Sequence, residues 1–417
     1  VTASASGDTI LMGGGTHVMT SSSKLNIAFD GSKILVIKGA GKDKTIFDAN
    51  QKNRHFYFDA INNSLLDTTF KIMDMTLKNG RPSSFASGGS VYLDGWWNGT
   101  ANLGHGPLFQ NVIFSDNQTK YNNDNGENGG AVYGNSGSSP YFRDVTFNNN
   151  HTNRYGGAVF LDGGGRITPQ VFQRTTFFKN HATSYFVDQE VQGGAIYIEY
   201  NGKTIIEHST FDSNYVSING GCCGNQGGAI NFRGSSDSVI VRYSKFRGNS
   251  VFIPDGNDGG QASGGAINFQ DNKTNVMIYS SLFEGNSVQS GIKNYSGGPE
   301  PKWSRGGALV VANGTMYNAT TDQWEYPQTV RVFNNTFVNN AATVTSNNSE
   351  RGYGGAFASE NGGIFTVFNN IFWGNSAIGQ DPNNEKNDFS HWNADWEWQF
   401  GYNNTMYMDY LNNSYGS

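Results

Sequence analysis

The chain has little charge and no long apolar run. Its 417 residues include 28 Lys and Arg against 34 Asp and Glu, and the formal net charge is −6. No Lys/Arg cluster is present, so nucleic acid is not expected as a partner, because phosphate binding needs concentrated positive charge. No apolar run approaches the roughly 18 residues that span a bilayer, so no transmembrane segment is expected.

Helical patterns and cysteines are also scarce. Apolar residues do not recur at helical spacing, and Ala, Leu and Glu are sparse. The two cysteines, Cys222 and Cys223, are adjacent in the sequence GCCGNQGG. The flanking glycines would accommodate the distorted turn of a vicinal disulfide, which we predict for this pair. Reduced thiols and bridges to another molecule are the alternatives.

Several features are typical of an exported protein. The chain begins at Val1, without Met and without a signal-like apolar region, as a processed secreted protein would. Asn-x-Ser/Thr sequons, which accept N-glycans, are frequent. They lie at Asn62, Asn98, Asn117, Asn150, Asn272, Asn294, Asn313, Asn318, Asn334, Asn347, Asn403 and Asn412. The expected glycan acceptors are Asn98, Asn294, Asn313, Asn318, Asn347 and Asn403. We therefore expect an extracellular or cell-surface location.

A repeated pair of motifs fills most of the chain. A Gly-Gly pair, usually continuing as GGAI or GGAV, is followed about 20 residues later by Phe-x-x-Asn. The Gly pairs begin at Gly88, Gly129, Gly156, Gly193, Gly227, Gly264, Gly306 and Gly354. The Phe-x-x-Asn sets begin at Phe114, Phe147, Phe177, Phe211, Phe246, Phe283, Phe337 and Phe372. Such a period indicates a repeat architecture, in which each unit buries its apolar face by stacking on its neighbours.

Within each repeat the apolar residues alternate with period two, as in a strand with one buried side. The fourth position of the Gly-Gly unit reads Val91, Val132, Val159, Ile196, Ile230, Ile267, Leu309 and Phe357. Each unit of about 30 to 40 residues therefore predicts one rung of a parallel β-helix. The motif Phe should stack inside, and the motif Asn should form an amide ladder between rungs. Asn117 and Asn150 would belong to that ladder and should carry no glycan.

The GGA and Phe-x-x-Asn motifs, from Gly88 to Asn375, resemble the repeat of the chlamydial polymorphic outer-membrane proteins and related adhesin-like proteins. The resemblance implies a right-handed parallel β-helix displayed outside the cell, usually in an adhesive or structural role. It implies no catalytic residues. This chain differs from the chlamydial members in having only two cysteines.

We expect an all-β, single-stranded right-handed parallel β-helix of about ten rungs. Residues 1–80 should form an N-terminal cap and lead-in rungs, 81–376 the repeats, and 377–417 an aromatic cap or docking tail. Three insertions should project as loops. They are Asp94 to Pro107, Gln289 to Arg305 and Asn313 to Tyr326.

One outer face carries the candidate site. The fifth position of the Gly-Gly strand should point outward and form an aromatic stripe that binds glycans, although such a ladder can also serve only to stabilise the sheet. These candidate glycan-binding residues are Tyr92, Tyr133, Phe160 and Tyr197. Nearby Asp162 and Glu199 could act as paired carboxylates with Arg233 as an electrostatic partner, which is the catalytic alternative.

No cofactor or metal is expected. His151 and His181 both follow a motif Asn and should stack at a turn, but two imidazoles alone make a poor metal site. The oxygen-rich turns at residues 124–130 and 255–260 could hold calcium, although neither has a full ligand spacing.

The sequence favours a non-catalytic extracellular protein that is adhesive or filament-forming. Its expected partners are further copies of itself, through the aromatic tail, and polysaccharides or cell-surface glycans. The alternative is a polysaccharide lyase or glycoside hydrolase that acts on one β-helix face.

Overall fold

The structure is a computed structural model in which every regular element of the described residues is a β-strand. The residues that it describes are 5–22, 25–29, 34–60, 68–82, 86–94, 106–120, 127–135, 137–162, 169–184, 190–200, 202–218, 224–234, 238–254, 261–270, 275–291, 303–312, 316–318, 323–325, 329–345, 351–360, 364–378, 388–392, 398–401 and 404–405. No helix with the length and apolarity of a membrane span occurs among them.

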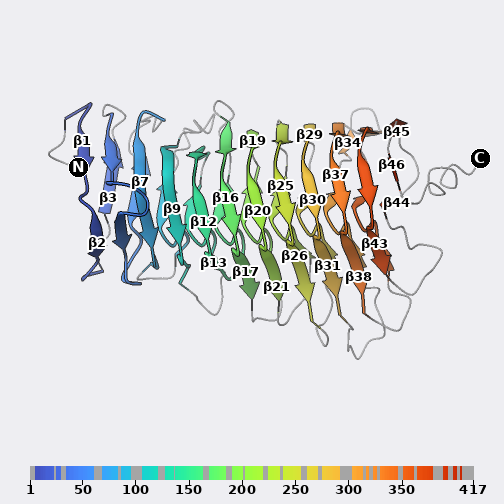
Figure 1. Ribbon diagram of the computed structural model, residues 1–417, viewed down its shortest axis with the longest axis horizontal. Helices are drawn as coiled ribbons and strands as arrows, with labels where there is room; N and C mark the ends of the chain where they lie inside the picture. Colours follow the sequence, from blue (N-terminus) through green and yellow to red (C-terminus); the bar gives the residue numbers. More distant parts are fainter. Residues whose placement is uncertain are drawn as a thin grey trace, which may run out of the picture. The chain divides into compact units, whose positions relative to one another are not determined.

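The chain divides into two compact units. The first comprises Val1–Ala182 and Ala195–Thr210, and the second comprises Thr183–Gly194 and Phe211–Ser417. Within each unit, strands pair in parallel with the equivalent strands of the rungs before and after (Figure 1). Each unit is therefore a stretch of parallel β-helix, which confirms the predicted fold class.

In each unit the strands after the Gly-Gly pairs form a sheet, here called the GGA sheet. In the first unit its order is β3 (Leu25–Phe29), β6 (Phe56–Ala60), β8 (Val91–Asp94), β10 (Val132–Gly134), β14 (Val159–Asp162) and β18 (Ile196–Glu199). In the second unit it is β23 (Ile230–Arg233), β28 (Ile267–Gln270), β33 (Leu309–Ala312), β40 (Phe357–Glu360) and β44 (Phe389–Trp392). Residues in equivalent repeat positions are register partners, for example Tyr92 and Tyr133.

In each unit the strands around the Phe-x-x-Asn motifs form a second sheet, here called the FxxN sheet. Its strands in the first unit are β1 (Thr9–Leu11), β2 (Gly15–Val18), β4 (Val36–Lys38), β5 (Thr45–Asp48), β7 (Lys71–Lys78), β9 (Leu108–Ser115), β11 (Tyr141–Arg143), β12 (Thr146–Asn148), β15 (Gln170–Gln173), β16 (Thr176–Phe178) and β19 (Lys203–Glu207). Those centred on the second unit are β20 (Thr210–Asp212), β24 (Ser238–Arg242), β25 (Lys245–Arg247), β29 (Asn275–Tyr279), β30 (Leu282–Glu284), β36 (Thr329–Phe333), β37 (Thr336–Val338), β41 (Ile364–Phe368), β42 (Ile371–Trp373), β45 (Trp398–Gly401) and β46 (Asn404–Thr405).

Shorter sheets complete the rungs. After the motif Asn come β13 (His151–Thr152), β17 (His181–Ser184), β21 (Tyr215–Ile218), β26 (Ser250–Ile253), β31 (Ser287–Ser290), β38 (Ala341–Val344) and β43 (Ser376–Ile378). Before the Gly pairs of the second unit come β22 (Gly224–Gln226), β27 (Gln261–Ser263), β32 (Trp303–Arg305) and β39 (Arg351–Tyr353). The predicted insertion at Asn313 to Tyr326 contains an antiparallel hairpin of β34 (Met316–Asn318) and β35 (Gln323–Glu325).

The core of each unit contains the predicted Phe stack. Phe147 lies 4.8 Å from Phe114 and 4.8 Å from Phe177, ring centre to ring centre, with nearly parallel rings. In the second unit Phe246 makes the same contacts with Phe211 and Phe283. These rings are buried, so each rung contributes its apolar surface to the next.

The motif asparagines form the predicted ladder. In the first unit the Asn117 side-chain amide donates to Asn150 Oδ1 at 3.0 Å, and that of Asn150 donates to Asn180 Oδ1 at 2.8 Å. Asn150 Nδ2 also donates to the Phe114 carbonyl at 3.0 Å. The Asn150 amide thus satisfies buried polar groups of the rungs before and after its own, which an apolar side chain would leave unpaired.

The two glycines of each pair have different tasks, as the pair at Gly129 and Gly130 shows. Gly129 has φ +67°, a left-handed conformation that favours glycine. A Cβ added to Gly130 would lie 2.0 Å from the Gly157 carbonyl oxygen of the next rung. The first glycine therefore makes the bend, and the second allows the backbones of successive rungs to approach.

The aromatic tail contributes a further rung. Its described strands β44, β45 and β46 pair in parallel with β40, β41 and β42. This part of residues 377–417 thus continues the strand pairing of the second unit, although it lacks the repeat motif.

Candidate functional site

The predicted aromatic stripe exists, but half of it is buried. Tyr133 and Phe160 stack with ring centres 5.0 Å apart, and Phe160 and Tyr197 with centres 5.2 Å apart. Phe160 is only 3 % exposed and Tyr197 is 0 % exposed, so neither ring is accessible to a glycan. Tyr155, the residue before a Gly pair, stacks on Tyr197 at 4.6 Å and covers it.

The equivalent positions of the second unit are also buried. Asn231 and Asn268 are 0 and 1 % exposed and their amides are joined by a 2.7 Å hydrogen bond. Asn231 also donates to Gln192 Oε1 at 3.0 Å, and Asn268 donates to Gln226 Oε1 at 2.9 Å. Gln192 and Gln226 both precede a Gly pair, as Tyr155 does. Residues in this position therefore cover the outer side of the GGA sheet.

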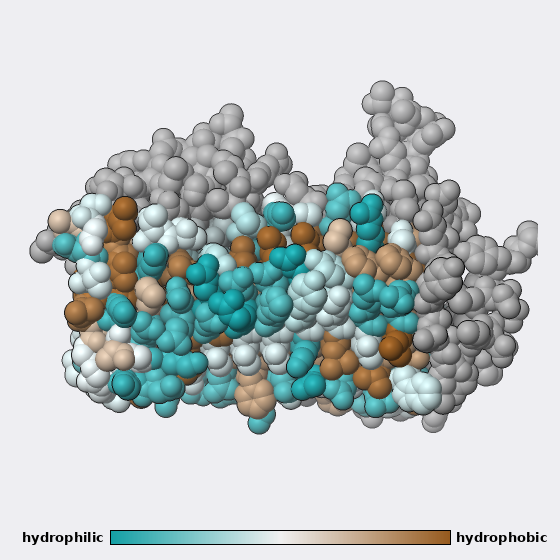
Figure 2. Space-filling view, turned by 45° about the horizontal axis from the view of Figure 1, so that its top comes forward, coloured by the Kyte–Doolittle hydropathy of each residue, from teal (hydrophilic) through white to brown (hydrophobic). Residues whose placement is uncertain are grey.

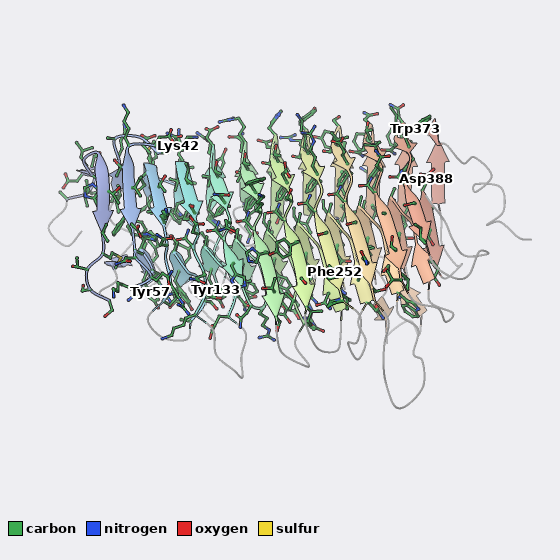
Figure 3. All side chains as sticks on the ribbon, turned by 60° about the horizontal axis from the view of Figure 1, so that its bottom comes forward. Lys42, Tyr57, Tyr133, Phe252, Trp373 and Asp388 are labelled. Carbon is green, nitrogen blue, oxygen red and sulfur yellow. The ribbon has the colours of Figure 1, made fainter. Side chains whose placement is uncertain are left out.

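Tyr57, Tyr92 and Tyr133 remain only partly buried on the GGA sheet of the first unit. Tyr57 and Tyr133 lie on the same side of the ribbon in Figure 3. Tyr92 lies between them, with ring centres 5.0 Å from each. Both faces of the Tyr92 ring are therefore in contact with another tyrosine, and its hydroxyl accepts a 3.3 Å hydrogen bond from Asn135 Nδ2. A sugar cannot stack on this ring in the way that the sequence predicted.

Carboxyl groups surround these tyrosines. Asp94 follows Tyr92 on β8, and its Oδ2 accepts a 3.1 Å hydrogen bond from the Tyr57 hydroxyl. Glu127 lies near Arg54 and Tyr92, and the Ser87 hydroxyl lies 3.3 Å from its Oε2. Asp162 ends β14, two strands from Asp94 in the sheet. We call Arg54, Tyr57, Tyr92, Asp94, Glu127, Tyr133 and Asp162 the tyrosine–carboxyl cluster.

Arg54 contributes a buried cation to this cluster. It precedes β6 and is 5 % exposed, and its guanidinium carbon lies 5.0 Å from the centre of the Tyr92 ring and 5.7 Å from that of Tyr57. Burial lowers the pKa of Arg54, while the two tyrosines and Glu127 oppose this effect. Its Nε has no hydrogen-bond partner within the described part of the chain. No repeat motif predicts the position of Arg54, because it lies in the lead-in rungs.

Burial also raises the pKa of several acidic groups of the cluster. It raises the pKa of Asp162, and it raises the pKa of Glu127 against the opposing effects of Ser87, Arg54 and Arg154. The pKa of Tyr92 rises to about 12, first through burial and then through the Asp94 charge. The pKa of Tyr133 is raised by burial as well. The phenols are therefore hydrogen-bond donors at neutral pH.

The predicted catalytic residues each end a strand of a GGA sheet. Asp162 and Glu199 are register partners on β14 and β18 of the first unit. Arg233 ends β23 of the second unit, and its Nη1 lies 3.8 Å from Glu190 Oε2. The structure thus places two of the three, the Asp162 and Glu199 carboxyl groups, on neighbouring rungs of one unit.

The remaining candidate sites are the stacked histidines, the cysteine pair and the oxygen-rich turns. The His151 and His181 rings stack at 4.5 Å, as predicted, and no group of three or more His, Cys, Asp or Glu side chains in the described ranges could hold a metal. Cys222, Cys223 and residues 255–260 lie outside the described residues, as do residues 124–126 of the other oxygen-rich turn. Five of the expected glycan acceptors also lie outside the described residues, namely Asn98, Asn294, Asn313, Asn347 and Asn403. The sixth, Asn318, lies on β34, where only the backbone is described.

Fold and motifs define a parallel β-helix protein built from GGA/FxxN repeats. Residues 144–162 match the Chlamydia polymorphic membrane protein repeat, which supports a repeat of this type. A solved structure, the GH136 lacto-N-biosidase from Eubacterium ramulus in its native form, is similar with 9 % sequence identity and a TM-score of 0.30. The similarity covers 90 % of this chain and 63 % of that one. No curated protein matches the chain.

Proposed function

We propose that this chain is an adhesin-like surface protein whose tyrosine–carboxyl cluster binds an uncharged glycan. The likeness of residues 144–162 to a polymorphic membrane protein repeat supports display at a cell surface. The glycan assignment depends on one observation, namely that partly buried phenols, carboxyls and a buried guanidinium gather on one sheet of the first unit.

The chemistry of the cluster favours sugar hydroxyls as ligands. Phenols and the Arg54 guanidinium donate hydrogen bonds, whereas carboxylates accept them, and a sugar hydroxyl can do both. Asp94, Glu127 and Asp162 outnumber Arg54, so an anionic sugar would be repelled. Because the tyrosine rings stack on one another, we expect recognition by hydrogen bonds at their edges instead of stacking on their faces.

The proposal can be tested on a glycan array, followed by calorimetry with the best uncharged ligand. The change Tyr133→Phe removes one hydroxyl and keeps the ring stack, so it should weaken binding by about 1 kcal/mol, or about fivefold. Tyr243→Phe is the matched control, since Tyr243 is an exposed tyrosine of the second unit, and binding should not change. Equal affinities of the Tyr133 variant and wild type would contradict this site.

One observation favours a second function, glycoside hydrolysis. Burial raises the pKa of Asp162, as a general acid requires, and Glu199 is its partner on the next rung. Neighbouring strands lie about 4.8 Å apart, close to the roughly 5–5.5 Å between the carboxyl groups of retaining glycosidases. Release of reducing ends from a polysaccharide, abolished by both Asp162→Asn and Glu199→Gln, would establish hydrolysis. Binding without turnover in wild type would reject it.

A further inference from the structure

Asn334, a sequon asparagine outside the six expected acceptors, lies at an exposed turn of the second unit. The turn joins β36 to β37, and Asn334 has φ +57°. The next residue, Asn335, points the other way and is 1 % exposed, with its amide donating to the Ile278 carbonyl at 3.0 Å. Thr336, the third residue of the sequon, begins β37 and is partly exposed. The folded chain therefore presents Asn334 and Thr336 while Asn335 anchors the turn.

The two ladder sequons have the opposite geometry. Asn117 and Asn150 are 0 % exposed, and the amide nitrogen of each donates two hydrogen bonds. That of Asn117 donates to Leu77 O and Asn150 Oδ1, and that of Asn150 to Phe114 O and Asn180 Oδ1. A glycan replaces one hydrogen of this nitrogen, so a sugar at either position would break the ladder.

The Asn334 amide nitrogen is available for this chemistry in its folded position. Its oxygen accepts a 2.5 Å hydrogen bond from Asn369 Nδ2 on the next rung. Glycosylation uses the nitrogen of the amide, and within the described ranges no hydrogen bond from Asn334 Nδ2 is present. The existing contact and a glycan are therefore compatible.

Exposed apolar side chains lie beside this turn. Phe333 stacks on Phe368 with ring centres 5.1 Å apart, and Phe368 is 37 % exposed. On β42, Ile371 is the register partner of Thr336 and is 46 % exposed, and Trp373 is 58 % exposed. Trp373 is labelled in Figure 3, and brown areas of apolar surface stand among teal ones in Figure 2. The carbon–hydrogen faces of a glycan on Asn334 would contact this patch and reduce its exposure to water.

We propose that Asn334 is an N-glycan acceptor, an inference that rests on the exported location proposed above. The Asn334 nitrogen forms a bond to the anomeric carbon of a lipid-pyrophosphate-linked oligosaccharide. The bond from that carbon to the pyrophosphate oxygen breaks, the lipid pyrophosphate leaves, and the nitrogen loses one proton. The oligosaccharyltransferase of the secretory pathway catalyses this transfer.

The test is secretion of the full chain from a eukaryotic host behind an added signal peptide, which makes the result independent of the native location and of glycan binding by the first unit. Enzymatic release of N-glycans in ¹⁸O water converts each occupied Asn to labelled Asp, which peptide mass spectrometry locates. We expect label at Asn334 and none at Asn117 or Asn150 in the folded, secreted protein. An unlabelled Asn334, or label at either ladder position, would overturn the proposal.

The chain offers a matched control one rung away. Asn369 occupies the equivalent turn with φ +54°, but the residue two positions on is Ile371, so it has no sequon. Asn334→Gln and Thr336→Ala should each remove one glycan, whereas Asn369→Gln should remove none. Adding Ile371→Thr to Asn334→Gln should move the glycan to Asn369. If this double variant is secreted with native circular dichroism and without that glycan, exposure of the turn does not decide occupancy and the proposal fails.

Discussion

Replacing Asn249 with alanine tests whether the asparagine ladder stabilises the rungs. Asn249 is 0 % exposed, and its amide donates to the Phe211 carbonyl at 3.0 Å and to Asn286 Oδ1 at 2.9 Å. Its Oδ1 accepts the Asn214 backbone N–H at 3.1 Å and the Asn214 side-chain amide at 2.9 Å. Alanine at this position would leave one backbone carbonyl and one backbone N–H buried without a side-chain partner.

The expected cost follows from those two groups. A buried polar group without a partner costs about 1–3 kcal/mol, so Asn249→Ala should destabilise the second unit by about 4 kcal/mol. Because repeat proteins open locally, hydrogen exchange at the Asn214 amide is the most direct measurement. Its exchange should become about a thousandfold faster, since each 1.4 kcal/mol corresponds to a factor of ten. Urea unfolding followed by circular dichroism would report the loss for the whole unit.

A suitable control is Asn339→Gly in the same unit. Asn339 is exposed, precedes the ladder residue Asn340, and has φ +54°, which glycine adopts readily. This change should alter stability by less than about 0.5 kcal/mol. If Asn249→Ala has no larger effect than Asn339→Gly, the ladder does not stabilise the rungs and the reasoning is refuted.

Three further changes have defined outcomes. Burial and the proximity of His181 lower the pKa of His151 to about 3, and burial also lowers the pKa of His181. The folded protein therefore favours the neutral imidazoles, and the stability that they contribute is present above about pH 6.5 and lost as the pH falls. His151→Gln should flatten the decline in urea midpoint between about pH 7 and pH 4. Gly130→Ala should prevent folding, because its Cβ would lie 2.0 Å from a carbonyl oxygen of the next rung; native circular dichroism would contradict this. Deleting residues 379–417 should increase light scattering, because β40, β41 and β42 lose their partner strands; a monomeric product would instead support the tail as the contact for self-association.

The sequence predicted the stacked interior because its signals are local and repeated. The spacing of Phe147 and Phe177, and of Asn150 and Asn180, follows the rung length, so alignment of the motifs was enough to pair them. Register within the rungs followed from alternation of apolar residues, which specifies the face that each side chain occupies.

The candidate site was harder to predict because alternation does not say what covers the outer face. Tyr197 alternates correctly with its buried neighbours but lies under Tyr155, which belongs to another repeat. Nothing in the motif identifies the residue before a Gly pair as a cover for the next rung. Arg54 and Tyr57 lie in the lead-in rungs, where no repeat places them beside Tyr92, so the cation of the cluster was missed.

The asparagine ladder makes the distance along the chain between two rungs irrelevant to their contact. Asn150 and Asn180 are 30 positions apart and bond at 2.8 Å, whereas Asn286 and Asn340 are 54 positions apart and bond at 2.9 Å. The described part of the longer turn includes the hairpin of β34 and β35, and the ladder hydrogen bond at its end is unchanged. Insertions between rungs can therefore vary in length and sequence without changing the packing of the interior, so the surface loops of this protein can diversify on a constant β-helix.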